Sequence, residues 1–138
     1  MEHITAPIVD IISLAPVIVL SVFAMGVLVV DLFIGKNKSL LVYLSLMGLF
    51  LTAVSSFAKG SLPSYSFNNS YVVDHFSIFF IFIFTISSAL AILLSVNYNI
   101  QENIKIGEYY SLILFCTVGM IILASSTDLI MIFLGIEI

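Results

Sequence analysis

Apolar residues in this chain fall into long stretches that contain no charged residue. Four such stretches span residues 11–30, 39–58, 76–96 and 109–127, with short polar segments between them. Each has about 20 residues, the length that an α-helix needs to cross the roughly 30 Å hydrocarbon core of a bilayer. The pattern therefore predicts four membrane-spanning helices.

A fifth apolar segment follows Asp128 and continues to Ile138, the last residue. Its length of about ten residues corresponds to roughly 15 Å, half of the hydrocarbon thickness. β-Barrel strands would alternate strictly over about ten residues, and these segments do not. We therefore expect an all-α membrane protein, a polytopic transmembrane helix bundle. One membrane domain (1–138), a fragment of a longer protein, would contain helices at about 11–34, 39–58, 76–96, 109–126 and 129–138, the last incomplete.

The polar segments between the stretches supply turn residues and interfacial aromatics. The longest, from Gly60 to Asn69, contains Pro63 and several Ser and Asn residues and is expected to be a loop. Most tyrosines lie at or beyond the predicted helix ends, where they would form an interfacial aromatic belt. These tyrosines are Tyr65, Tyr71, Tyr98, Tyr109 and Tyr110.

Composition supports a membrane protein and excludes several other classes. Apolar residues make up 62% of the chain and charged residues 9%, and the mean hydropathy is +1.26, whereas a soluble domain has about 25% charged residues. The net charge of −4 and the absence of arginine give no basic patch for nucleic acid. The lone Cys116 allows no disulfide framework or cysteine metal cluster, and its apolar surroundings predict a buried, inert thiol.

The few lysines indicate an orientation. Lys36, Lys38 and Lys105 fall in the first and third polar links, whereas Lys59 borders the second. By the positive-inside rule, the first and third links would face the cytoplasm and the N-terminus would lie outside.

Charged residues at the predicted helix ends have simple structural interpretations. Asp74 and Asp128 precede apolar segments and are expected to be N-caps that accept hydrogen bonds from unpaired amides. Asp31 and Glu108 are expected to be solvated at the membrane surface. His75 is interpreted as interfacial, with a role in a proton relay as the alternative.

Small and hydroxyl-bearing residues recur every three or four positions in two of the predicted helices. Such stripes allow helices to approach closely in lipid, and lining a hydrated path is the alternative. The residues are Ser45, Gly48, Thr52 and Ser55 in one helix and Ser87, Ala91 and Ser95 in the other. The Phe-rich third segment is explained by contact with lipid and neighbouring helices, without a cofactor site.

Glu137 is the exception, because it falls at membrane depth. It lies nine residues after Asp128, about 13–14 Å further along the helix and close to the bilayer midplane. A charged carboxylate there costs several kcal/mol unless it is neutralised, paired or hydrated. Glu137 is therefore the candidate proton-handling residue, and the alternative is that it only marks the end of the fragment. No cationic partner occurs at membrane depth in the sequence.

The segment from Gly107 to Glu137 carries a specific resemblance to a known family. It reads G-E-Y-Y-x-L-x-L-F-x-x-x-G-M-x-x-x-A-S-x-x-D-L-x-x-x-F-L-G-x-E and resembles subunit N of the proton-pumping NADH–quinone oxidoreductase, respiratory complex I. The motif V-D-x-F-x-x-F-F, from Val73 to Phe80, also agrees with that family. The resemblance implies that this chain corresponds to the N-terminal part of an antiporter-like bundle of about 14 helices with inverted repeats.

The resemblance also implies roles for individual positions. Glu137 matches a fifth-helix glutamate that is thought to pair with a lysine two helices later and to take part in proton translocation. Gly119 would serve packing and Asp128 the helix turn. NADH, FMN, iron–sulfur clusters and quinone are expected in other subunits, so no cofactor is expected in this chain.

We therefore interpret the chain as part of a complex I membrane-arm subunit in a bacterial plasma membrane, contributing to proton translocation coupled to electron transfer from NADH to quinone. The fragment alone is not expected to be catalytic, and its partners would be the other membrane-arm subunits and the lipid bilayer. Two alternatives remain open: a subunit of a multisubunit sodium/proton antiporter, and a truncated, non-catalytic membrane scaffold.

Overall fold

The computed structural model describes residues 11–33, 39–57, 64–66, 70–101 and 106–138. Its elements are α1 (Ile11–Phe33), α2 (Ser39–Phe57), β1 (Ser64–Ser66), β2 (Tyr71–Val73), α3 (His75–Gln101), α4 (Ile106–Ser125) and α5 (Leu129–Glu137). In the described part of the chain, α1 to α4 each contain a segment long and apolar enough to span a membrane. The four predicted spans are confirmed.

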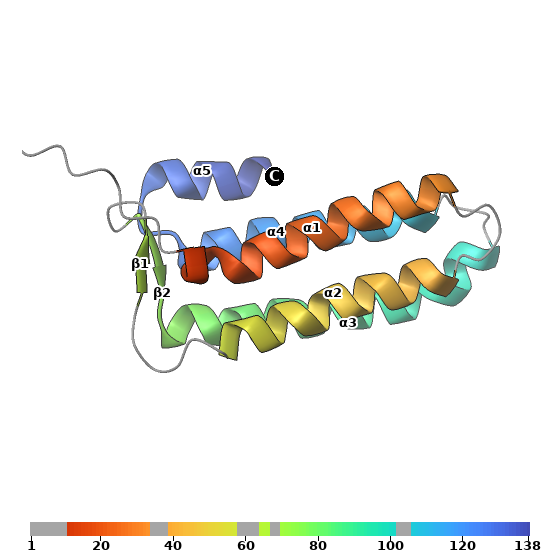
Figure 1. Cartoon of the computed structure of the whole chain (residues 1–138), viewed down its shortest axis with the longest axis horizontal. Helices are drawn as coiled ribbons and strands as arrows, with labels where there is room; N and C mark the ends of the chain where they lie inside the picture. The colour runs from red at the N-terminus through yellow and green to blue at the C-terminus, as the bar shows by residue number, and fades with distance from the viewer. Residues whose placement is uncertain (1–10, 34–38, 58–63, 67–69, 102–105) are drawn as a thin grey trace, which may run out of the picture.

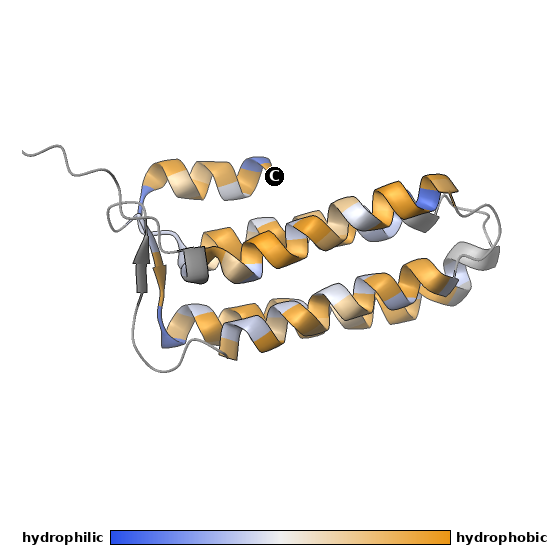
Figure 2. Cartoon of the chain, viewed as in Figure 1, coloured by the Kyte–Doolittle hydropathy of each residue, from blue (hydrophilic) through white to orange (hydrophobic). Residues whose placement is uncertain are grey.

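Successive helices run in opposite directions, so α1 to α4 form an antiparallel bundle (Figure 1). Helix α1 packs against α2 and α4, and α3 packs against the same two helices. Helix α5 packs mainly against α4, outside the bundle. Apolar residues cover the outer surfaces of the helices, whereas hydrophilic residues lie mainly near their ends (Figure 2). This distribution is the one expected for helices surrounded by lipid.

Two features of the bundle ends differ from the sequence expectation. Helix α3 continues to Gln101, five residues beyond the predicted end at Val96, because the prediction followed the apolar span and the helix is longer than that span. The expected loop before α3 contains a short antiparallel hairpin, in which Ser64 pairs with Val73 and Ser66 with Tyr71. The run Tyr71–Val73 consists of aromatic and β-branched residues, which favour an extended backbone.

Hydroxyl groups fill much of the interior of the bundle. All polar residues that are buried in the described structure are Ser or Thr. Most of their hydroxyls donate to a carbonyl one turn earlier in the same helix, as Ser45 does to Leu41 and Thr52 to Gly48, at 2.8 Å each. These bonds satisfy most of the buried hydroxyls within one helix, so the helices can pack closely. Among the described residues, the buried hydroxyls of Tyr71 and Ser125 have no hydrogen-bond partner.

The predicted small-residue stripe is correct on α2, whereas on α3 it is correct at Ser95 and wrong at Ser87 and Ala91. Ser45, Gly48 and Thr52 are buried and Ser55 is half-buried, whereas Ser87 and Ala91 are exposed. The buried face of α3 is rotated by about one residue from the predicted stripe. It consists of Ser77, Ile81, Thr85, Ser88, Ile92 and Ser95.

Two further expectations about side-chain burial are wrong. Tyr71 and Tyr110 are each 1% exposed, so they lie in the interior and not in an aromatic belt; Tyr98 is exposed as expected. Cys116 is exposed on α4, contrary to the buried thiol that its apolar surroundings indicated. Apolar neighbours in sequence do not imply burial here, because the lipid-facing surface of a membrane helix is apolar as well.

Candidate functional site

The two aspartates that precede α3 and α5 behave differently. Asp74 is an N-cap as predicted, because its Oδ1 accepts a hydrogen bond from the Ser77 amide at 2.8 Å. Asp128 occupies the N-cap position of α5 with an extended backbone, but its side chain makes no capping bond. Its Oδ2 accepts instead from the Ser70 hydroxyl at 3.3 Å, so the predicted capping role of this side chain is wrong.

Hydrogen bonding has an electrostatic consequence at Asp74. The amide and hydroxyl of Ser77 donate to the Asp74 carboxylate and hold its pKa below its ordinary value, although partial burial opposes this effect. Asp74 is therefore charged at neutral pH and contributes to the start of α3.

The depth of Glu137 follows from the contact between α4 and α5. Gly135 of α5 lies against Gly119 of α4, so that a Cβ atom placed on Gly119 would be 2.7 Å from the Gly135 carbonyl oxygen. Glu137 is two residues, about 3 Å, beyond this contact in an antiparallel helix, which places it level with Thr117. Thr117 lies at the centre of the α4 span, Glu108–Ser125. The carboxylate is thus level with the middle of the apolar segment.

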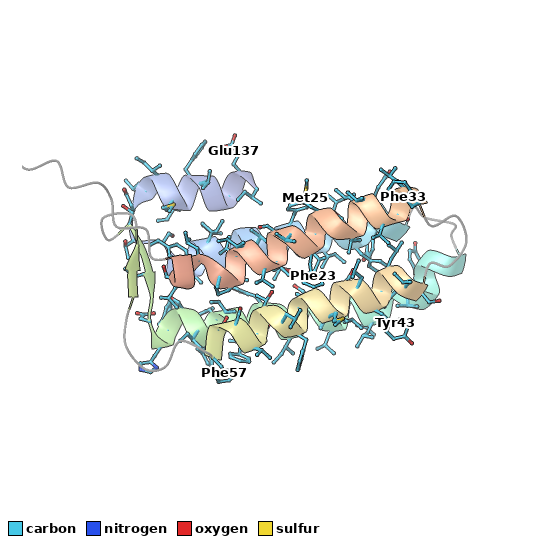
Figure 3. The ribbon with its side chains drawn as sticks, in the orientation of Figure 1. Phe23, Met25, Phe33, Tyr43, Phe57 and Glu137 are labelled. Carbon is cyan, nitrogen blue, oxygen red and sulfur yellow. The ribbon has the colours of Figure 1, made fainter. Side chains whose placement is uncertain are left out.

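Glu137 faces away from the bundle. Its side chain is exposed and points away from α4 in Figure 3. Gly135 is the buried residue of α5, and successive helical residues are about 100° apart, so Glu137 lies about 200° from the face that contacts α4. The described ranges contain no lysine or arginine. A cation that pairs with Glu137 would have to come from outside them.

The other candidate residues are at the helix ends. Asp31 is half-buried near the end of α1, His75 is exposed at the start of α3, and Glu108 is exposed in the first turn of α4. None of the three is at the depth of Glu137. The proton-relay role considered for His75 therefore gains no support from its position.

A polar junction that the sequence did not predict connects the hairpin with the ends of α3 and α4. The Ser77 hydroxyl lies within hydrogen-bonding distance of the Val72 and Ala124 carbonyl oxygens, at 3.1 Å each. Tyr71 is buried beside the junction and forms a β-bridge with Ser126. Burial raises the pKa of the Tyr71 phenol, and the nearby Ser125 hydroxyl partly offsets this effect. The junction fixes the turn from which α5 starts.

An apolar groove lies between α3 and α4. It has a volume of about 280 Å³ and is lined by Phe76, Phe80, Phe84, Met120, Leu123 and Ala124. No titratable side chain lines this groove, so its lining offers only apolar contacts. Among the described side chains, Glu137 is therefore the strongest candidate for proton transfer, because it is an ionisable group at membrane depth.

Four apolar spans and an acidic side chain at mid-span define the class: a polytopic helical membrane protein with an ionisable group at membrane depth. Comparison with known proteins gives a more specific relationship. No family model matches the chain. This chain is 42% identical over 123 residues to NADH-quinone oxidoreductase subunit N of Trichlorobacter lovleyi. The aligned region covers 88% of this chain and 25% of that protein.

Similar matches occur in other bacteria. Subunit N of Chloroflexus aggregans is 37% identical over 139 residues, covering 99% of this chain and 28% of that protein. Subunit N of Dehalococcoides mccartyi is 38% identical over 123 residues, covering 88% and 25%, respectively. The chain thus spans about a quarter of the length of the curated relatives it matches. The resemblance to subunit N of NADH-quinone oxidoreductase is confirmed over most of this chain.

Proposed function

We propose that this chain is part of a membrane-arm subunit of a proton-translocating NADH:quinone oxidoreductase. In this role it contributes to proton translocation coupled to electron transfer from NADH to quinone. The observation that carries the proposal is the position of Glu137: an acidic side chain, exposed on α5, level with the middle of the α4 span. The relatives, which are named as subunits of that oxidoreductase, support it.

The physical argument concerns the cost of charge in lipid. A lone ionised carboxylate at mid-membrane is unfavourable by several kcal/mol, so Glu137 binds a proton, pairs with a cation or contacts water. A cation that approaches favours the charged form, and its retreat favours the protonated form. Movement of such a cation, outside the described residues, would make Glu137 release and take up a proton in each cycle.

The proposal divides the work among subunits. The redox reaction takes place in other subunits, which bind NADH, FMN, iron–sulfur clusters and quinone, and this chain holds no cofactor. Catalysis then belongs to the assembled complex and not to this segment alone. The partners are other membrane-arm subunits and the lipids of a bacterial inner membrane. The N-terminus faces the periplasm, because three of the four lysines lie in the first and third links.

The test is Glu137→Gln in a full-length subunit N that carries this segment, assembled with its partner subunits in vesicles. Glutamine keeps the size of the side chain but cannot exchange a proton, so we expect fewer protons to be pumped per NADH oxidised. Asp31→Asn is the matched control, since it removes a carboxylate near the end of α1, and pumping should be retained. Unchanged pumping in Glu137→Gln would refute the role of this residue.

A separate experiment tests the assignment to the complex. Purification of the full-length protein from native membranes should also yield flavin-containing and iron–sulfur subunits. Their absence would contradict the proposal and favour a sodium/proton antiporter subunit.

A further inference from the structure

Helix α5 is held against α4 by two glycines with no room for a side chain. A Cβ on Gly135 would lie 2.9 Å from Leu123 Cγ and 3.1 Å from the Gly119 carbonyl oxygen, and a Cβ on Gly119 would lie 2.7 Å from the Gly135 carbonyl oxygen. By contrast, a Cβ on Gly26 of α1 would have no neighbour within 4 Å. At this crossing the two backbones themselves approach closely, whereas Gly26 has open space around it.

The start of α5 is fixed independently, through hydrogen bonds to the hairpin side of the bundle. The Thr127 amide donates to the Ser70 carbonyl oxygen at 3.1 Å, and the Ser70 hydroxyl donates to Asp128 Oδ2 at 3.3 Å. Ser126 forms a β-bridge with Tyr71, whose side chain is fully buried. The turn between α4 and α5 is thus bound to residues more than fifty positions earlier in the chain.

These two contacts lie at opposite ends of a nine-residue helix. The hydrogen bonds fix where α5 begins, and the glycine pair fixes how close its second half lies to α4. Because Glu137 follows Gly135 by two residues on the opposite face, any outward shift of α5 displaces the carboxylate by a similar distance. The same shift changes how far the carboxylate extends from the bundle towards a partner.

We propose that Gly119, Gly135 and the Ser70–Asp128 hydrogen bond are positioning elements that set the location of Glu137 for proton transfer. The inference rests on the proposed function. It adds groups that do not exchange the proton themselves but determine where Glu137 lies. A misplacement of about 1 Å can reduce a rate by up to a hundredfold, so a single added methyl group is a sufficient perturbation.

The test uses Gly135→Ala in the full-length subunit within the assembled complex. We expect the rate of proton pumping to fall by about tenfold. The pH at which pumping is half-maximal should also shift, because the carboxylate then meets its partner at a different distance. Leu123→Ala removes the Cγ atom that the new methyl group would meet at 2.9 Å. The double variant Leu123→Ala/Gly135→Ala should therefore recover part of the pumping and of the original pH profile, since the Gly119 carbonyl oxygen still lies 3.1 Å from the new methyl group.

Gly48→Ala is the matched control for loss of packing alone. It creates a slightly tighter contact, 2.7 Å between the new Cβ and Phe23 Cβ compared with 2.9 Å at Gly135, but where α1 contacts α2. We expect less assembled complex and an unchanged pH profile. A Gly135→Ala complex whose pH profile matches that of the wild type, or one that Leu123→Ala does not rescue even in part, would overturn the inference.

Ser70→Ala keeps the inference testable if Gly135→Ala does not assemble. It removes only the hydroxyl that donates to Asp128, and we expect a smaller shift of the pH profile in the same complex. An unshifted profile would overturn the positioning role. Failure of the proposed function and failure of the positioning role can be distinguished. Unchanged pumping in Glu137→Gln would refute the proposed function, whereas an unshifted pH profile in the positioning variants would refute only the positioning role.

Discussion

Helices α2 and α5 are both strongly apolar, yet they are packed in different ways. Helix α2 packs against both α1 and α3, and its buried residues include serines, a threonine, a glycine and leucines. In α5, by contrast, the buried residue is Gly135. An enclosed helix satisfies its hydroxyls internally and contributes stability. A helix packed on one side leaves its other face available, and Glu137 is on that face. From this difference we infer that the four-helix bundle contributes mainly to stability, whereas α5 carries the candidate proton-transfer residue.

The largest predicted effect tests the enclosed part of the molecule. In Gly48→Ala, the new Cβ would lie 2.7 Å from Phe23 Cβ and 2.8 Å from its Cγ. Overpacking of this kind should lower the free energy of unfolding by about 1–3 kcal/mol. The measurement is loss of helical circular dichroism as denaturing detergent is added to the protein in mixed micelles.

Gly26→Ala is the control for this variant, because its Cβ would meet no atom within 4 Å. Alanine is also the better helix former, so stability should be unchanged or higher by up to about 1 kcal/mol. Equal destabilisation in the two variants would contradict the proposed close packing of α1 and α2.

The next effect compares the starts of α3 and α5. Asp74→Ala removes a capping bond and should cost about 1 kcal/mol, whereas Asp128→Ala removes only the 3.3 Å bond from Ser70 and should cost less. Detergent unfolding of both variants under the same conditions gives the comparison. A larger loss in Asp128→Ala would show that the turn before α5 matters more than the cap of α3.

The stabilising effect of Asp74 depends on pH, because its carboxylate must be charged to act fully as a cap. Its folded-state pKa is lowered from 3.8, so its stabilising effect is present above pH 3.8 and is lost as the pH falls through the lower folded-state value. The difference in stability between wild type and Asp74→Ala should therefore shrink in acid. Since the side chain is exposed, solvent screening keeps this change small.

The sequence predicted the helices well because membrane spans are defined by charge-free length alone. It could not identify which face of α3 is buried, since Ser87 and Ser88 each fit a three- or four-residue spacing, and only contact with α4 selects Ser88. Tyr71 is buried next to a backbone β-bridge with Ser126, more than fifty residues away, and no local pattern reveals that pairing. Glu137 is indicated by its depth and by its match to a fifth-helix glutamate of the resembling family, and its role in proton transfer stays a prediction.

The smallest predicted effect concerns the contact that selects the face of α3. The hydroxyls of Ser88 and Thr117 are 2.6 Å apart and buried, and Thr117 also donates to the Ile113 carbonyl oxygen at 2.8 Å. Because Thr117 has a single proton, its hydroxyl accepts from Ser88 when it donates within its own helix. The bond therefore connects α3 with α4 at the level of Glu137 without contacting α5.

A double-mutant cycle of Ser88→Ala and Thr117→Val in mixed micelles measures this bond. Hydrogen bonds between membrane helices average about 0.6 kcal/mol by such cycles, and we expect a coupling energy of that size. In the assembled complex, the same variants should leave the pH profile of proton pumping unchanged, since the bundle and not α5 is affected. A shifted profile would mean that the interior of the bundle influences Glu137, and the separation between a stabilising bundle and a chemically active α5 would no longer hold.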